Sequence, residues 1–273
     1  MIRQPAVAGQ FYEGSAATLK RQVEDCIDPK AKKVEAIGAM CPHAGLMYSG
    51  KAAGAVYSRM IMPDTLVLIG PNHHGLGPDF SIMTEGVWRT PLGDVRVDVD
   101  VAGEIFKHSR YLEQDQFSQQ REHSLEVQVP FIQYFRPDIQ IVPISLKHYD
   151  PDDNFLRICE AIGEGIATGL SKVRSKVAII ASSDMSHYEP KKTAEGKDRA
   201  ALDAVVALDA KRLFKVVRER DISMCGYAAT AATLTACKLR GAKKAELVRY
   251  MTSGDATGDY SSVVGYAGVL ITT

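Results

Sequence analysis

The chain has 273 residues, and its 33 Lys and Arg residues balance 33 Asp and Glu residues. Hydrophobic residues make up 45% and charged residues 24%, as in ordinary globular proteins. A nucleic-acid-binding protein usually shows a basic excess or a basic face, so no nucleic-acid partner is expected. We also expect no membrane segment and a cytoplasmic location, because no apolar run approaches about 18 residues and no leader is recognisable.

The cysteines do not form a recognisable framework. There are five of them, widely spaced and without a Cys-x-x-Cys pair: Cys26, Cys41, Cys159, Cys225 and Cys237. This pattern argues against both a disulfide scaffold and a zinc ribbon. The length is compatible with one α/β domain spanning residues 1–273.

The first half of the chain alternates strand and helix patterns. Ser15 is predicted to cap an amphipathic helix that runs through Ile27, and Asp98 or Asp100 to cap one that ends at His108. Apolar and alternating runs predict strands at 34–40 and 65–69, a helix at 51–59, and short strands between 80 and 99.

The second half continues the alternation. A helix over 122–131 is predicted, which Pro130 bends or resets, and Asp209 is expected to break the helical stretch 197–219 and to cap its second part. The other predicted helices are 155–170 and 227–239, and the strands are 139–146, 177–181, 245–251 and 262–271. The alternation predicts a layered α/β domain with a mostly parallel sheet, and the stretch 80–99 adds antiparallel pairing.

Histidines follow two of the predicted strands. His43 lies in a Pro/Gly turn after the strand at 34–40, and His73 and His74 lie in another after 65–69. Asp184 and His187 follow the strand at 177–181. If these three strands are parallel, the side chains emerge at one edge of the sheet, where open α/β folds bind ligands.

Neutral imidazoles on neighbouring loops suit iron, copper or zinc, with a carboxylate or thiolate as third ligand. Cys225 precedes a small-residue helix, whose N-terminus would lower the pKa of the thiol. From its position alone Cys225 is a metal ligand, a redox-sensitive nucleophile or an inert small residue, and these alternatives stay open.

Two carboxylates stand close to histidines. Asp184 with His187, and Glu122 with His123, are candidate pairs in which a carboxylate orients an imidazole for acid–base chemistry. The alternatives are that Asp184 caps a helix and that Glu122 and Glu126 lie on an exposed helix face.

A set of motifs, in this order, resembles the Memo family. These motifs are Ala8–Tyr12, Pro42–Gly45 with Tyr48–Gly50, Gly70–His74, Trp88–Gly93, Glu122–Glu126 with Pro130, Ser182–His187, and Cys225–Gly226. The resemblance implies a three-layer α/β/α fold akin to the class III extradiol dioxygenases. It implies His43 and His73 as metal ligands, with Cys225 in the place of the third ligand.

The same resemblance implies that Asp184 and His187 line the pocket and that His123 lies near the substrate, so these three are the expected catalytic residues. Only the resemblance favours His73 over His74. It also implies a redox metal, iron or copper in preference to zinc, and an association with radical-SAM and AMMECR-type proteins.

Three functions are compatible with these expectations. The first is a metal-dependent, dioxygenase-like oxidoreductase that acts on an unknown small molecule. The second is a non-catalytic module that binds a peptide or protein in the same pocket. The third is a zinc-dependent hydrolase, since zinc held by two histidines and a cysteine leaves a position for water.

Overall fold

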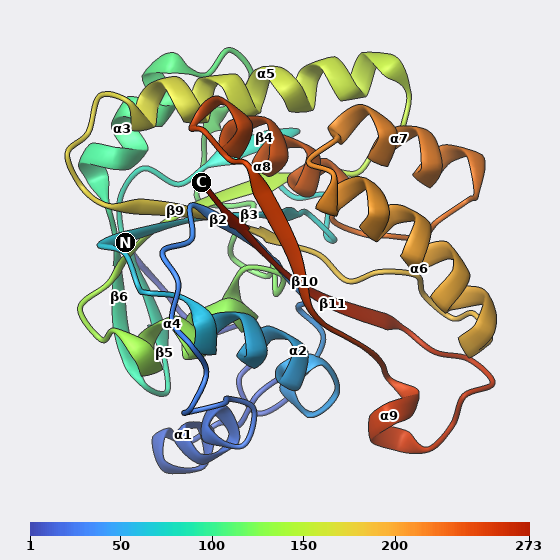
Figure 1. Cartoon of the computed structure of the whole chain (residues 1–273). Helices are drawn as coiled ribbons and strands as arrows, with labels where there is room; N and C mark the ends of the chain where they lie inside the picture. The colour runs from blue at the N-terminus through green and yellow to red at the C-terminus, as the bar shows by residue number, and fades with distance from the viewer.

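The computed structural model describes all 273 residues and contains one large mixed sheet (Figure 1). Its strand order is β1-β5-β6-β8-β3-β9-β2-β11-β10, and β4 and β7 extend it beside β8. The strands are β1 (Ile2–Arg3), β2 (Gly38–Cys41), β3 (Thr65–Pro71), β4 (Phe80–Ile82), β5 (Val87–Thr90), β6 (Gly93–Val97), β7 (Glu113–Gln114), β8 (Gln140–Leu146), β9 (Val177–Ser182), β10 (Lys244–Thr252) and β11 (Gly265–Thr272).

The centre of the sheet is parallel. Strands β8, β3, β9 and β2 lie side by side in this order and all run in the same direction. Antiparallel pairs follow on both sides, where β11 joins β2 and where β5 and β6 form a hairpin. Strands β3 and β9 are buried along their whole length, as expected for parallel strands covered on both faces. The predicted mixed, mostly parallel core of the sheet is confirmed.

Helices cover both faces of the sheet (Figure 1). Helix α8 packs on β2, β3 and β9, with α5 and α7 against it and α3 against α5, whereas α2 lies on β2, β10 and β11, with α1 and α4 beside it. The helices are α1 (Ala16–Glu24), α2 (Leu46–Arg59), α3 (Val99–His108), α4 (Val129–Phe135), α5 (Asp153–Leu170), α6 (Lys191–Val206), α7 (Ala210–Glu219), α8 (Tyr227–Leu239) and α9 (Gly254–Thr257). The expected three-layer α/β/α fold is confirmed.

Three predicted helix caps are confirmed. The side chain of Ser15 accepts the N–H of Thr18 at the start of α1. Asp98 and Asp209 do the same for the third residues of α3 and α7, at 3.0 and 2.9 Å. Each cap satisfies an amide that the first turn of a helix leaves without a partner, which explains why these helices begin where they do.

The predicted helix over 122–131 is wrong. The segment starts with a turn, continues as a 3₁₀ turn (Glu126–Gln128), and becomes helical only in α4. The cause is the Glu122 carboxylate, which binds the N–H groups of His123 and Ser124. Pro130 lies in the first turn of α4, where its missing N–H removes no hydrogen bond, so of the two expected effects it resets the helix and does not bend one.

Two smaller differences concern the start of one helix and the presence of another. Helix α2 begins at Leu46, five residues before the predicted start at 51, so it follows the His43 turn almost directly. The short helix α9 lies in a loop for which no helix was predicted. None of the helices combines the length and the apolar character that crossing a bilayer requires.

Candidate metal centre

The loops that carry the predicted site residues leave the same edge of the sheet. Strand β9 lies between β3 and β2, and its last residue, Ser182, pairs with Cys41 at the end of β2. Because the three strands are parallel, the segments that follow them emerge together. The convergence of His43, His73 and Asp184 at this edge, expected from the sequence, is confirmed.

Three imidazoles meet there. The ring centroid of His43 lies 5.3 Å from that of His73 and 5.5 Å from that of His123. The rings of His73 and His123 are stacked, with their centroids 4.5 Å apart. One ligand atom from each residue lies within 4.8 Å of the other two, which is close enough for a single metal ion. His43 is buried, whereas the His73 side chain is 31% exposed, so the cluster opens to solvent on the His73 side.

Glu122 holds His73 in place. Its Oε1 lies 2.8 Å from Nδ1 of His73, and its Oε2 accepts the backbone N–H of the same residue at 2.6 Å. Burial raises the pKa of this carboxyl group, but the hydrogen bond from His73 and the charges of His73 and His123 outweigh it, and the net shift is downward. Glu122 is therefore a carboxylate, so Nδ1–H of His73 donates to it and Nε2 is the free ring nitrogen.

His74 lies on the exposed side of the same turn. With Glu122 and His123 it forms a second group whose ligand atoms lie within 4.8 Å of one another. However, Oε1 of Glu122 already contacts His73 Nδ1 and accepts the N–H groups of His123 and Ser124. The geometry thus favours His73 as the histidine that faces His43.

Cys225 contacts His43. Its Sγ lies 3.3 Å from Nε2 of His43 and accepts the N–H of Asp184 at 3.3 Å. Gly226 makes this approach possible, because a Cβ there would lie 2.4 Å from the carbonyl oxygen of Ser182. Within the 4.8 Å group, however, the third residue is His123, so the role of Cys225 as third ligand stays a prediction.

The expected lowering of the Cys225 pKa is wrong. Burial, and then the neighbouring Asp184 carboxylate, raise the pKa of this thiol. The N–H of Gly226, at the start of α8, donates to Ser183 Oγ at 3.0 Å and not to the sulfur. Without a metal, these surroundings favour the thiol over the thiolate at this position.

Asp184 and His187 do not pair with each other. Oδ1 of Asp184 accepts the N–H groups of His43 and Ala44, at 2.8 and 3.3 Å, and so fixes the turn that presents His43. No helix begins at Asp184, so the helix-cap alternative is wrong. Nδ1 of His187 lies 2.8 Å from the carbonyl oxygen of Ser223. This contact holds the imidazole beside the segment that carries Cys225.

Sequence reasoning missed three residues of the site. Ser182 Oγ lies 3.0 Å from Nδ1 of His43, and Gln128 donates to Ser182 at 2.9 Å. The ring of Phe11 lies 4.8 Å from that of His123. Ser182 and Phe11 lie inside the motifs of the resemblance. However, the sequence does not indicate which side chain an uncharged serine or a phenylalanine contacts.

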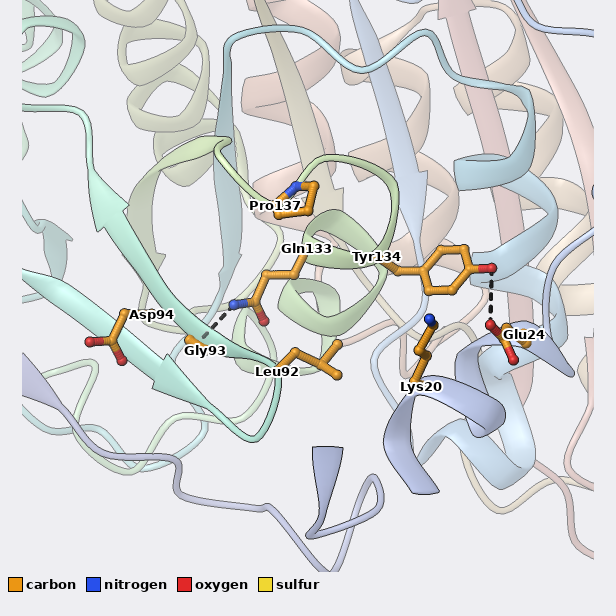
Figure 2. A pocket seen from close by; sticks show the side chains of 8 residues that line it. All are labelled: Lys20, Glu24, Leu92, Gly93, Asp94, Gln133, Tyr134 and Pro137. Carbon is orange, nitrogen blue, oxygen red and sulfur yellow. Dashed lines mark hydrogen bonds between the residues drawn. The ribbon is translucent and has the colours of Figure 1, made fainter. Parts of the chain in front are cut away.

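A surface cavity of about 520 Å³ lies elsewhere, between α1, α4 and the β5–β6 turn (Figure 2). Two of its polar side chains already have partners, since Gln133 donates to the carbonyl oxygen of Gly93 and Tyr134 donates to Glu24. None of the predicted site residues lines it; the lining residues are Lys20, Glu24, Leu92, Gly93, Asp94, Gln133, Tyr134 and Pro137. The candidate site is therefore the histidine cluster.

Stability of the metal-free chain is expected to fall in mild acid. Burial lowers the pKa of His43 well below its ordinary value and that of His123 to about 4. Between about pH 4 and pH 6.5 the His123 imidazole is protonated only in the unfolded chain, and the lowered pKa of His43 acts in the same direction, so the unfolded chain binds more protons. The free energy of unfolding should decrease as pH falls through this window, by up to about 1.4 kcal/mol per pH unit for each group.

Urea unfolding at a series of pH values between 7 and 5 measures this slope. The variant His123→Gln should show a shallower dependence, because one of the two groups is removed. Equal slopes in the variant and the unchanged protein would contradict the assignment to His123.

Comparison with known proteins assigns the chain to a family. The family model described as "Memo-like protein" matches residues 3–270. The chain belongs to the Memo family. A MEMO1 family protein of Methanothermobacter thermautotrophicus is 41% identical over 98% of this chain and 99% of its own, and one of Nitrosopumilus maritimus is 40% identical over the same shares. The Memo resemblance seen in the sequence is thus confirmed.

A solved structure shares the fold of this Memo-family chain. The crystal structure of the uncharacterized protein JW3007 from Escherichia coli K12 superposes with a TM-score of 0.56 over 86% of this chain and 99% of that one. The sequence identity is 10%, so the likeness concerns the fold alone.

Proposed function

We propose that this Memo-family protein is a metal-dependent oxidoreductase, dioxygenase-like in its chemistry, in which His43 and His73 bind one iron or copper ion and Cys225 is the third ligand. The observation that carries the proposal is the meeting of His43, His73 and His123 with ligand atoms within 4.8 Å of one another. Both proposed metal histidines are held through Nδ1 by buried partners, as is typical of metal-binding histidines.

The donor atoms fit such an ion. Imidazole nitrogen suits iron, copper and zinc, and a thiolate adds a preference for copper or zinc. Sγ of Cys225 lies 3.3 Å from Nε2 of His43, so both atoms are close enough to bind the same ion. Because the pKa of the free thiol is raised, metal binding must displace its proton, and affinity should increase with pH. When bound, the ion supplies redox chemistry on a substrate held next to it.

The surrounding residues supply proton transfer and orientation. His123 is neutral at pH 7, since its pKa is lowered to about 4, so its imidazole is able to accept a proton from a substrate. His187 is anchored through Nδ1 to the Ser223 carbonyl, which leaves its Nε2 free for a second proton transfer. Asp184 contributes by fixing the turn of His43 and the position of Cys225 through its backbone N–H.

Metal stoichiometry tests the proposal. Protein purified without oxygen and loaded with Fe(II) or Cu(I) should contain about one ion per chain by elemental analysis. His43→Ala and Cys225→Ser should each lower this content, because each removes a donor atom. His108→Ala is the matched control, since that histidine is bound to the carbonyl oxygen of Glu104 on α3. Full metal content in both site variants would refute the assignment.

A further inference from the structure

The hydroxyl of Ser182, the last residue of β9, lies at the centre of a buried polar network behind His43. Its Oγ lies 2.6 Å from the carbonyl oxygen of Ser124, 2.9 Å from Nε2 of Gln128 and 3.0 Å from Nδ1 of His43. All four residues are buried, with 1% or less of each residue exposed. Every donor and acceptor must therefore be satisfied within the network.

The direction of the bond to Ser124 follows from chemistry. A backbone carbonyl only accepts hydrogen bonds, so the single proton of the Ser182 hydroxyl is donated to it. The two lone pairs of the hydroxyl oxygen then remain for partners that donate.

The direction of the bond to Gln128 is also fixed. Its Nε2 lies 2.9 Å from the carbonyl oxygen of Pro42, which must accept, so this end of the amide is the NH₂ group. The other end, Oε1, accepts the hydroxyl of Tyr57 at 2.9 Å. Gln128 therefore donates to Ser182 and occupies one of its lone pairs.

Only one role is left for His43. Since the Ser182 proton is committed to Ser124, the contact at 3.0 Å requires a proton on Nδ1 of His43. The neutral ring then carries its lone pair on Nε2, the nitrogen that faces Sγ of Cys225. The opposite tautomer would set two lone pairs against each other in a buried site.

We propose that Ser182 is a positioning residue that holds His43 in the Nδ1–H tautomer and so presents the Nε2 lone pair to the centre of the histidine cluster. The tautomer assignment stands on the hydrogen-bond network alone. Its use for metal binding rests on the proposed function. His73 receives the same tautomer from Glu122, so the two proposed ligands are prepared in the same way by different partners.

Nitrogen NMR of the metal-free full-length chain tests the tautomer directly. In protein labelled with ¹⁵N-histidine, and with His43→Gln to assign its signals, His43 should show a protonated Nδ1 and an unprotonated Nε2. Ser182→Ala should shift this pattern towards Nε2–H, and Ser182→Thr, which keeps a hydroxyl, should retain it. Tyr57→Phe is the matched control and should leave the pattern unchanged, because Pro42 still orients Gln128.

A wild-type spectrum with Nε2 protonated would overturn the proposal, whether or not the variants fold. An Nδ1–H pattern that persists in folded Ser182→Ala would also overturn it.

Titration with Zn²⁺, a diamagnetic probe, separates this inference from the proposed function. Ser182→Ala should weaken Zn²⁺ binding about 10-fold or more, as the loss of partners behind metal ligands usually does. Unchanged affinity in that variant would overturn the positioning role. Wild-type protein that shows Nδ1–H at His43 but binds no Zn²⁺, Fe(II) or Cu(I) would refute the proposed function and support the tautomer assignment.

Discussion

Replacing Glu126 with alanine is expected to destabilise the folded chain by about 3–5 kcal/mol. Oε2 of Glu126 lies 2.6 Å from Nη1 of Arg3, and the two side chains are 0% and 4% exposed. The substitution would leave the Arg3 guanidinium buried without its counter-charge. It would also remove the acceptor of the N–H groups of Ala6 and Val7 and of the Tyr12 hydroxyl.

The effect should extend to the site, because Arg3 ties the N-terminal segment to the loop that carries Glu122. Arg3 donates to the carbonyl oxygens of Gln119 and Glu122, at 2.6 and 2.7 Å. Its guanidinium also lies 4.2 Å from the ring centre of Trp88, a contact that favours the buried position. Loss of Glu126 should therefore loosen the segment just before Glu122, the residue that holds His73 in place.

Urea unfolding followed by circular dichroism measures this loss, provided that the denaturant dependence is unchanged. Asp94→Ala is the matched control. It breaks the exposed pair of Arg89 and Asp94, whose side chains are 45% and 42% exposed, and should lower stability far less than the loss of the buried pair. Comparable losses in the two variants would mean that the buried pair is not a main source of stability.

The position of the site was predictable from the sequence because it depends on strand order. His43, His73 and Asp184 each follow an apolar strand, and parallel strands bring such residues to one edge wherever the strands are neighbours. The helix caps were predictable for a similar reason, since Asp98 and Asp209 act within three residues of their own positions.

The partners of the polar groups were not predictable in this way. Glu122 was paired with the adjacent His123, but its closer imidazole is His73, 49 residues away, at 2.8 Å against 3.5 Å. The sequence does not show that burial and the Asp184 carboxylate raise the pKa of Cys225, nor that the amide at the helix start binds Ser183, 43 residues from Gly226 in sequence. Such choices depend on how loops from different strands pack, and periodicity says nothing about that packing.

Replacing Glu122 with glutamine is expected to weaken metal binding about 10- to 100-fold and to cost about 1–3 kcal/mol of stability. The carboxylate accepts the N–H groups of His73, His123 and Ser124 while it orients Nδ1 of His73. An amide has one oxygen, so its NH₂ group must face at least one of these donors. The neutral amide also no longer increases the basicity of the His73 ring.

Competition with a chromophoric zinc chelator measures the affinity, and urea unfolding of the metal-free protein measures the stability. Glu164→Gln, on the exposed face of α5, is the matched control and should change neither. A Glu122→Gln variant that loses stability but binds zinc with unchanged affinity would show that Glu122 braces the loop without preparing His73. A loss of zinc affinity at unchanged stability would show that Glu122 prepares His73 for metal binding without bracing the loop. The four hydrogen bonds of the carboxylate would then contribute little to stability, and its main effect would be electrostatic, on the His73 ring.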